Sequence, residues 1–591
     1  MSQKPAEVPY LEIDPRRALA WLNSFARAHA AALLSGVLLA VMALQMFAVI
    51  WRKSIAIDEV VMIPAAYYHL GAGNYQLVNE HPALAKIVAG LPLLFVQPNE
   101  VRPDQILHTP GTTEAKWETQ AAIWDNNFDR FETLSFWPRA AMIFLALALG
   151  ILIFRFGREL FGDRAAVIAV GLFALEPTFL AHGRVVQTDV PAALGYLLFF
   201  VALYYFNREP TLRRAVWLGA ATAVAVLAKF SMLLVGPVLV PFFVFKLWRP
   251  GSIGRRRILT LAALVLLVTV VVINGAYFFQ RPALMPGEIA WVNDPTIALT
   301  RFDSSAVTFF SFWLPKDFVL GILFQLRHNS SGHWAGFLGM HSQKGWWYYF
   351  PVAFALKATL PFLLLSLTAL AWAIYQTFRR RVWFYLWLIV PFVLYTVFVL
   401  FSHINIGVRY YLPAYPFLII LGAGLLDQLL KSTRARTVAV VLTVALLGWV
   451  AIEAVRAFPH HMSYMNQLAS GAPPWWYLSD SNVEWGDDSR LLAQELHARG
   501  ETRVTDATLG GWATLRFYGI DRVDPLAATP PENPPRYIAI GASYLNGSTI
   551  PFPPGPNVTD TDRVNFFSEY RQRVPEAVIG GSIYLYRQTG H

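Results

Sequence analysis

Long apolar runs separated by short polar segments dominate this chain of 591 residues. A helix needs about 20 mostly apolar residues to cross the hydrocarbon core of a bilayer. The pattern predicts a polytopic α-helical membrane protein with about 11 transmembrane helices. The candidate spans are Ala30–Trp51, Pro138–Phe156, Ala165–Leu180, Val190–Phe206, Ala215–Leu234, Val235–Trp248, Ile258–Phe279, Phe350–Phe378, Val382–Phe401, Tyr410–Leu430 and Thr437–Ala457.

Lysine and arginine gather in alternate loops between these runs, and this alternation predicts the orientation of the chain. Basic residues in short loops stay on the cytoplasmic side of a membrane. We therefore expect segment 1–29 to be cytoplasmic and the region after the last span to lie outside. The basic groups are Arg16, Arg17 and Arg27; Arg155, Arg158 and Arg164; Arg208, Arg213 and Arg214; Lys246, Arg249 and Arg255–Arg257; Arg379–Arg381; and Lys431, Arg434 and Arg436.

The rest of the chain divides into outer loops and a C-terminal domain. Residues 30–457 are predicted to form the transmembrane domain, with long outer loops at 52–137 and 280–349. Residues 458–591 are expected to form an extracytoplasmic α/β domain, because helical and strand-like stretches alternate with Pro-rich loops. The helix is predicted at Asp488–Arg499, the strands at Arg536–Gly541 and Ser582–Arg587, and the loops at Thr529–Pro535 and Ile550–Pro556.

Composition excludes several classes of protein. Hydrophobic residues make up 55% of the chain and charged residues 15%, so a soluble protein could not cover its surface. The absence of cysteine excludes disulfides, thiolate zinc sites and cysteine nucleophiles. The net charge of +10 is explained by the loop charges that set topology, so no nucleic-acid partner is predicted.

Ionisable residues near the outer ends of the predicted helices are the candidates for chemistry. Charges at membrane depth are costly and usually functional. Taken singly, each of them could be a snorkelling side chain or an interhelical ion pair. As a set, carboxylates and cations on one membrane face suit a substrate with a lipid tail and an anionic head. The set consists of Asp58, Glu59, Arg139, Arg184, Asp189, Lys229, Lys357 and Arg409.

Five short motifs on the outer side resemble a known family. They are Ile57-Asp58-Glu59, Asn79-Glu80-His81-Pro82-Ala83-Leu84, Gly183–Asp189, Gly345–Pro351 and Gly407–Pro413. In order and spacing they look like the polyprenyl-phosphate-sugar-dependent glycosyltransferases with the GT-C fold. Protein O-mannosyltransferases and lipid A aminoarabinose transferases are the members that they resemble most.

The resemblance implies an inverting sugar transfer on the outer face of the membrane. The donor would be a polyprenyl-phosphate-linked sugar, and the acceptor hydroxyl would belong to a protein, lipid or glycan. Asp58 would deprotonate that hydroxyl. General base catalysis of this kind typically raises the rate by about 10²–10⁴-fold. Arg184 and Arg409 would stabilise the leaving phosphate.

The resemblance also implies roles for the remaining candidates. Glu59 would orient the acceptor or the base as a second catalytic carboxylate, and Asp189 would position Arg184 or the sugar. The other expected substrate-binding residues are Glu80, His81, Arg139, Lys229 and Lys357.

The chain departs from the family pattern in three places. Ala83 stands where the family has a second proline. The segment Gln280–Tyr349 is too short for the β-trefoil insert of eukaryotic O-mannosyltransferases, so a bacterial-type enzyme in the plasma (inner) membrane is expected. The stretch Leu478–Gly486 is not part of the eukaryotic pattern, which leaves the acceptor open.

No cofactor is predicted, and a divalent metal is kept as the alternative. Some oligosaccharyl transferases of the same fold class hold a metal with an acidic pair, but Asp58 and Glu59 are adjacent and would diverge on a strand. His328, His333 and His341 follow no known ligand spacing and are interpreted as packing or acceptor-binding residues.

Two other functions share the helix count and the buried charges. One is a lipid or sugar transporter or flippase, which should place charges near the membrane midplane on broken helices. The other is a non-catalytic scaffold whose C-terminal domain binds a partner. An Asp58→Asn variant separates these functions, because it should abolish sugar transfer by an enzyme with folding intact and should matter little to a scaffold.

Overall fold

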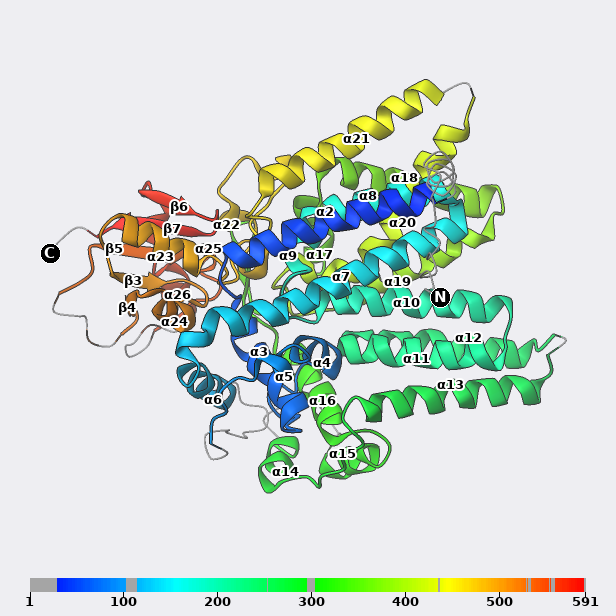
Figure 1. Cartoon of the computed structure of the whole chain (residues 1–591), viewed down its shortest axis with the longest axis horizontal. Helices are drawn as coiled ribbons and strands as arrows, with labels where there is room; N and C mark the ends of the chain where they lie inside the picture. The colour runs from blue at the N-terminus through cyan, green and yellow to red at the C-terminus, as the bar shows by residue number, and fades with distance from the viewer. Residues whose placement is uncertain are drawn as a thin grey trace, which may run out of the picture.

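Long helices run side by side through the molecule, and a sheet-containing domain lies at one end of them (Figure 1). The protein is thus a polytopic α-helical membrane protein with a C-terminal domain that contains a sheet, as predicted. Apart from His29, the expected cytoplasmic segment 1–29 lies outside the described residues, as does Arg434. The computed structural model describes residues 29–102, 114–251, 253–294, 303–433, 436–527, 529, 533–551, 553 and 558–588.

Nine helices within the described residues are long and apolar enough to cross a membrane, judged by length and composition. A helix satisfies its own backbone N–H and C=O groups, which is why apolar runs of this length become helices. The nine are α2 (Ala30–Arg52), α7 (Phe131–Phe161, entered through η2, Phe128–Arg130), α10 (Asp189–Arg208), α12 (Gly236–Trp248, entered through η3, Phe230–Val235), α13 (Arg255–Gly275), α18 (Leu360–Arg379), α19 (Leu386–Leu400, entered through η4, Trp383–Tyr385), α20 (Tyr415–Lys431, entered through η5, Val408–Ala414) and α21 (Arg436–Ala457).

Two of the eleven predicted spans form shorter helices. Helix α8 (Asp163–Leu175) has 13 residues and is followed by α9 (Pro177–His182). The break between α8 and α9 has a local cause: α9 begins with Pro177, and a proline disfavours helical backbone in the residue before it. Helix α11 (Leu212–Ala228) has 17 residues and ends at Lys229, whose backbone is extended. The count of eleven membrane spans therefore stays a prediction.

Small residues let neighbouring helices approach closely. A Cβ atom built on Gly195 of α10 would lie 2.7 Å from the Cα atom of Ala225 in α11. Similarly, a Cβ atom on Gly219 of α11 would lie 2.7 Å from the carbonyl oxygen of Val265 in α13. In lipid, where helices gain little from hydrophobic burial, such close van der Waals packing stabilises their association. Helices α10, α11 and α13 therefore form a tightly packed series.

The two predicted outer loops contain short helices and a hairpin, and α3–α6 lie beside the sheet domain (Figure 1). Helix α3 packs against α4, and α4 packs against α7. This arrangement brings the first loop onto the ends of the long helices. The elements of the first loop are α3 (Ile57–Gly71), α4 (Ala83–Gly90), α5 (Leu93–Val96) and α6 (Glu114–Asp125). Those of the second are α14 (Pro286–Val292), α15 (Ser304–Ser311), α16 (Lys316–Ser331), β1 (Ala335–Phe337) and β2 (Met340–Ser342), followed by α17 (Tyr349–Lys357).

The C-terminal domain is built on a mixed five-stranded sheet in the order β4-β3-β5-β7-β6. Strand β3 is parallel to β4 and β5, whereas β7 is antiparallel to β5 and β6. The predicted helix and both predicted strands are confirmed as α23, β5 and β7. The elements are β3 (Arg503–Ala507), β4 (Asp521–Val523), β5 (Tyr537–Gly541), β6 (Ala577–Ile579), β7 (Ile583–Arg587), α22 (Pro474–Tyr477), α23 (Ser489–Ala498), α24 (Gly511–Thr514), α25 (Ala542–Asn546), α26 (Asp560–Asn565), η6 (Gln467–Ala469), η7 (Asp480–Asn482), η8 (Leu515–Tyr518) and η9 (Ser568–Arg571).

The close contact between α10 and α11 makes a first prediction. Gly195→Ala should destabilise the protein by about 1–3 kcal/mol, because the added methyl group overpacks the interface with Ala225. Gly448→Ala in α21 is the matched control, since its Cβ atom would meet nothing within 4 Å. Thermal unfolding in detergent measures both variants. Equal unfolding temperatures for the two would contradict the packing described.

Candidate active site

Four ionised side chains from four helix ends meet at the sheet-domain end of the bundle, and we refer to them as the Asp58 cluster. Arg409 Nη1 lies 3.1 Å from Asp58 Oδ2 and 3.5 Å from Asp189 Oδ2, so one guanidinium bridges two carboxylates. Lys229 Nζ lies 2.5 Å from Asp189 Oδ1. Gln187 Nε2 donates a hydrogen bond of 2.7 Å to Asp58 Oδ2. The structure thus brings together four of the predicted site residues.

Helix termini position the members of the cluster. Asp58 lies in the first turn of α3 and Asp189 begins α10, where carboxylates interact favourably with the positive end of the helix dipole. Lys229 follows the last residue of α11, and Arg409 lies in the η5 turn that leads into α20. Each charge thus has a partner at a depth where an unpaired charge is costly.

The carboxylate of Asp58 is the accessible part of the cluster. Its side chain is 30% exposed, against 12% for Lys229 and 5% for Arg409. Aromatic rings cover both cations: the Arg409 guanidinium lies 4.1 Å from the ring centroid of Trp485, and Lys229 Nζ lies 3.7 Å from that of Tyr410. Cation–π contacts of this kind strengthen when water is excluded. The cluster therefore combines one accessible carboxylate with cations in fixed positions.

Glu59 is buried and binds backbone. Its Oε2 accepts the N–H of Ala56 at 2.7 Å, and its Oε1 accepts the N–H of Val186 at 2.8 Å. Burial raises the pKa of Glu59, although Arg139 and the two backbone N–H groups oppose that effect. The expectation of a strand at this point is wrong, because Asp58 and Glu59 lie in the first turn of a helix. Their side chains do diverge, and Glu59 ties α3 to the loop before α10.

Glu80 and His81 form a second polar site beside the cluster. Glu80 pairs with Lys116 of α6. Burial on its own raises the pKa of Glu80, but Lys116 and His81 bring that pKa down to about 2. Burial lowers the pKa of His81 to about 4, against the opposing effect of Glu80 and Asp58. His81 is therefore a neutral imidazole at pH 7, within electrostatic reach of Asp58.

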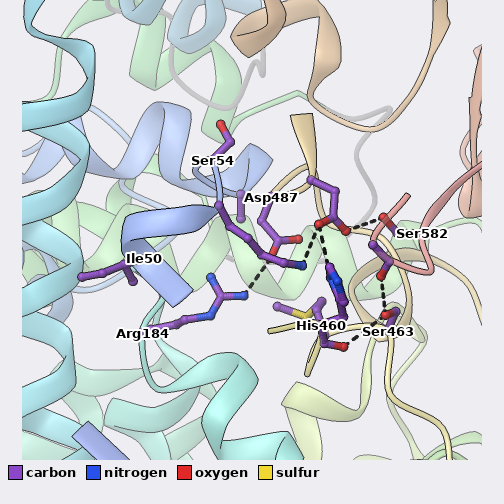
Figure 2. A network of polar contacts seen from close by, with 12 residues as sticks. Ile50, Ser54, Arg184, His460, Ser463, Asp487 and Ser582 are labelled. Atoms are coloured by element: carbon purple, nitrogen blue, oxygen red, sulfur yellow. Dashed lines mark hydrogen bonds and ion pairs between the residues drawn. The ribbon is translucent and has the colours of Figure 1, made fainter. Parts of the chain in front are cut away.

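Arg184 belongs to a different group of charges, which we refer to as the docking network: Lys53, Arg184, Asp487, Asp488 and Ser582. Arg184 Nη2 lies 2.7 Å from Asp487 Oδ2, and Lys53 Nζ lies 2.6 Å from Asp488 Oδ1. Ser582 Oγ donates to Asp488 Oδ2 at 2.5 Å. Figure 2 shows Arg184 facing Asp487, with Ser582 on the opposite side of the network.

The docking network changes the role expected for Arg184. Its side chain is fully buried, and its partner comes from the C-terminal domain. Asp189, which was expected to position Arg184, pairs with Lys229 and Arg409 instead. Arg184 therefore holds the C-terminal domain against the bundle.

Arg139 and Lys357 also bind backbone carbonyl groups rather than an open site. Arg139 donates to the carbonyl oxygens of Ile50 and Ser54, both at 2.9 Å, and so caps the end of α2. Lys357 Nζ donates to the carbonyl oxygen of Met462 at 2.7 Å and to that of Asn482 at 2.5 Å. Both side chains are buried, so the structure supports a positioning role for them and not direct binding of a substrate.

Of the three histidines of the second outer loop, His341 contacts the C-terminal domain. The His328 and His333 rings are 5.6 Å apart, and His341 Nε2 lies 2.5 Å from the carbonyl oxygen of Asn546. Within the described part of the chain, no group of three or more His, Cys, Asp or Glu side chains is placed to hold a metal ion.

Several residues of the site escaped the sequence analysis. Gln187 lies inside the motif Gly183–Asp189, but its side chain is uncharged and the candidates were chosen by charge. Trp485 lies in the stretch Leu478–Gly486, which was interpreted only as a departure from the family pattern, and Asp487 directly follows it. Lys116 is 36 residues from Glu80 in an outer loop, so only the fold shows the pair.

One family model matches part of the chain. Residues 132–274, from α7 to α13, match the family model described as dolichyl-phosphate-mannose-protein mannosyltransferase. No curated protein matches the sequence.

Two solved structures are similar to a large part of this chain. ArnT from Cupriavidus metallidurans, bound to undecaprenyl phosphate, has 16% identity and a TM-score of 0.44, over 72% of this chain and 70% of that chain. AglB from Archaeoglobus fulgidus, in complex with an inhibitory peptide and a dolichol-phosphate, has 13% identity and a TM-score of 0.44. That match covers 86% of this chain and 62% of the archaeal one, so the chain spans less than two thirds of that relative.

The docking network makes a second prediction. Asp487→Asn should cost about 3–5 kcal/mol, because it leaves the buried Arg184 without its carboxylate. Limited proteolysis and thermal unfolding should both show a loosened C-terminal domain. Asp521→Asn, at an exposed position of β4, is the control and should match the wild type. Wild-type protease resistance in Asp487→Asn would contradict a docking role.

The lowered pKa of His81 makes a third prediction. Between about pH 6.5 and pH 4 the unfolded chain binds a proton on this residue that the folded chain does not, so stability falls as the pH is lowered through that window. Between pH 7.5 and pH 5, the unfolding temperature of His81→Gln should fall less than that of the wild type. A change at the exposed His497 to Gln is the control. An equal fall of the unfolding temperature in the wild type and in His81→Gln would contradict the lowered pKa of His81.

Proposed function

We propose that the protein is a glycosyltransferase of the GT-C type that uses a polyprenyl-phosphate-linked sugar. It would transfer the sugar, with inversion, to an acceptor hydroxyl of a protein, lipid or glycan. The observation that carries this proposal is the Asp58 cluster, an accessible carboxylate beside two fixed cations at the ends of membrane helices. The match of residues 132–274 to a mannosyltransferase family supports it independently.

The geometry fits a base-catalysed displacement at the anomeric carbon. Asp58 would take the proton of the acceptor hydroxyl while the acceptor oxygen attacks that carbon. The bond from the anomeric carbon to the phosphate oxygen would break, and its electron pair would leave with the polyprenyl phosphate. The cations would stabilise the charge on this leaving group, so no strong acid is needed.

Competition for Arg409 links donor binding to the base. In the structure Arg409 is shared between Asp58 at 3.1 Å and Asp189 at 3.5 Å. The charges of the two cations and the two carboxylates neutralise one another. An incoming phosphate therefore has to compete for a guanidinium that is already paired. A donor phosphate that draws Arg409 away from Asp58 would free that carboxylate to accept a proton. Asp189 and Tyr410 would keep the guanidinium in place meanwhile.

The charge pattern supports an orientation for the enzyme. The basic groups at Arg155–Arg164 and Arg208–Arg214 lie at the far end of α7 and α10 from the Asp58 cluster. Basic loops stay in the cytoplasm, so the site and the domain 458–591 would face outward from a bacterial plasma membrane. A lipid-linked donor in the outer leaflet would then reach the site from the side. Gathering of the ionised groups at one end favours this function over a transporter with a midplane site.

The role of Asp58 makes a fourth prediction, which tests the proposed function. Asp58→Asn should lower sugar transfer by at least about 100-fold with little change in unfolding temperature, since the side chain is partly exposed. Glu59→Gln is the matched comparison and should instead lower stability, because Glu59 holds two backbone groups.

The assay combines purified protein in lipid with radiolabelled sugars on undecaprenyl phosphate and a cell-envelope extract. Label moving to an acceptor with wild type and not with Asp58→Asn supports the proposal, and the labelled product identifies the acceptor class. Failure of the wild type to bind or use any of these donors would overturn it.

A further inference from the structure

A single loop of the C-terminal domain reaches both ionised partners at the centre of the site. This is the 478–488 loop, which includes the η7 turn and ends where α23 begins. All of its residues are buried, at the junction of the C-terminal domain and the ends of the membrane helices. Besides the docking network, its contacts include the two segments that carry Asp58 and Arg409.

On one side the loop holds the start of α3. The N–H of Ile57 donates to the carbonyl oxygen of Trp485 at 2.8 Å, and the N–H of Ser54 donates to that of Asp487 at 2.9 Å. Ile57 directly precedes Asp58, so these bonds set where the catalytic carboxylate stands. Gly486 has φ of +93° and lies so close to Leu509 that a Cβ atom would approach its carbonyl oxygen to 2.6 Å.

On the other side the loop holds the start of η5. The N–H of Val408 donates to Asn482 Oδ1 at 2.8 Å, and Ser481 Oγ donates to the carbonyl oxygen of Ile406 at 2.6 Å. Val408 directly precedes Arg409. The backbone before each member of the Asp58–Arg409 pair is therefore bonded to the same short loop.

The side chain of Trp485 completes this arrangement. Its buried indole lies 4.1 Å from the Arg409 guanidinium, while Arg409 Nε has no hydrogen-bond partner among the described residues. The ring thus contacts a cation whose polar contacts are to Asp58 and Asp189. The loop also contributes the carboxylate of Asp480, which lies within electrostatic reach of Arg409, His333 and Asp58.

We infer that the 478–488 loop is part of the active site, and that Trp485 is a positioning residue that holds Arg409 in register with Asp58. The inference rests on the proposed function and adds to it that the C-terminal domain is required for the chemistry itself. Reacting groups need to be held near their productive geometry, and small displacements cost large factors in rate. Loss of the indole should therefore act on turnover through Arg409.

The test compares Trp485→Leu and Trp485→Phe in the full-length protein. Trp485→Leu should lower kcat for sugar transfer by about tenfold to thirtyfold, and Trp485→Phe should restore most of the rate because a phenyl ring still faces the cation. Trp476→Leu, nine residues earlier and partly exposed, controls for local disturbance of the domain. Unfolding temperature and binding of undecaprenyl phosphate are measured for each variant.

A double-mutant cycle with Arg409→Lys separates positioning from folding. If Trp485 acts through Arg409, Trp485→Leu should have little further effect on kcat in the Arg409→Lys protein. Equal losses in both backgrounds, or a loss that only follows the unfolding temperature, would overturn the inference. So would a wild-type rate in Trp485→Leu while the wild type transfers sugar. A wild type that neither binds undecaprenyl phosphate nor transfers sugar would overturn the proposed function together with the inference.

Discussion

Buried charge at the junction of the membrane helices and the C-terminal domain is the constraint on which this structure depends. Lys53 and Arg184 are fully buried, and a buried cation without a partner is strongly destabilising. Their carboxylates, Asp487 and Asp488, lie more than 300 residues away from Arg184 in the chain. The C-terminal domain therefore supplies the carboxylates that these two buried cations need, and the docking network makes its contact with the bundle specific.

The same junction explains how similar residues take different roles. Asp58 and Glu59 are neighbours in α3, yet one faces the cations of the cluster and the other is bonded to backbone N–H groups. Arg409 and Arg184 are both buried arginines, yet Arg409 shares its guanidinium with an accessible carboxylate and Arg184 pairs with an inaccessible one. Exposure of the partner, not the residue type, separates the groups that can meet a substrate from those that hold the fold.

Sequence reasoning was most successful where local physics dominates. Apolar length predicted the helices, and the α23, β5 and β7 elements agree with their predicted ranges to within one residue at each end. It failed for helix breaks, because α8 and α11 stop at local backbone features that hydropathy does not register. It also assigned Arg139 and Lys357 to substrate, since charge alone cannot distinguish a cation that binds carbonyl oxygens from one that binds a ligand.

The sequence by itself determined that the chain crosses a membrane and predicted that its ionisable residues gather at one set of helix ends. Those conclusions follow from the length of apolar runs and from loop charge, which are local properties, whereas the choice of Asp58 as the carboxylate to test follows from the resemblance of its motifs to a known family. Only the tertiary structure decided which charges meet. The pairs of Asp58 with Arg409 and of Arg184 with Asp487 join residues 351 and 303 positions apart. Contacts over such separations depend on how helices and domain pack, and the chain's local pattern carries no record of that packing.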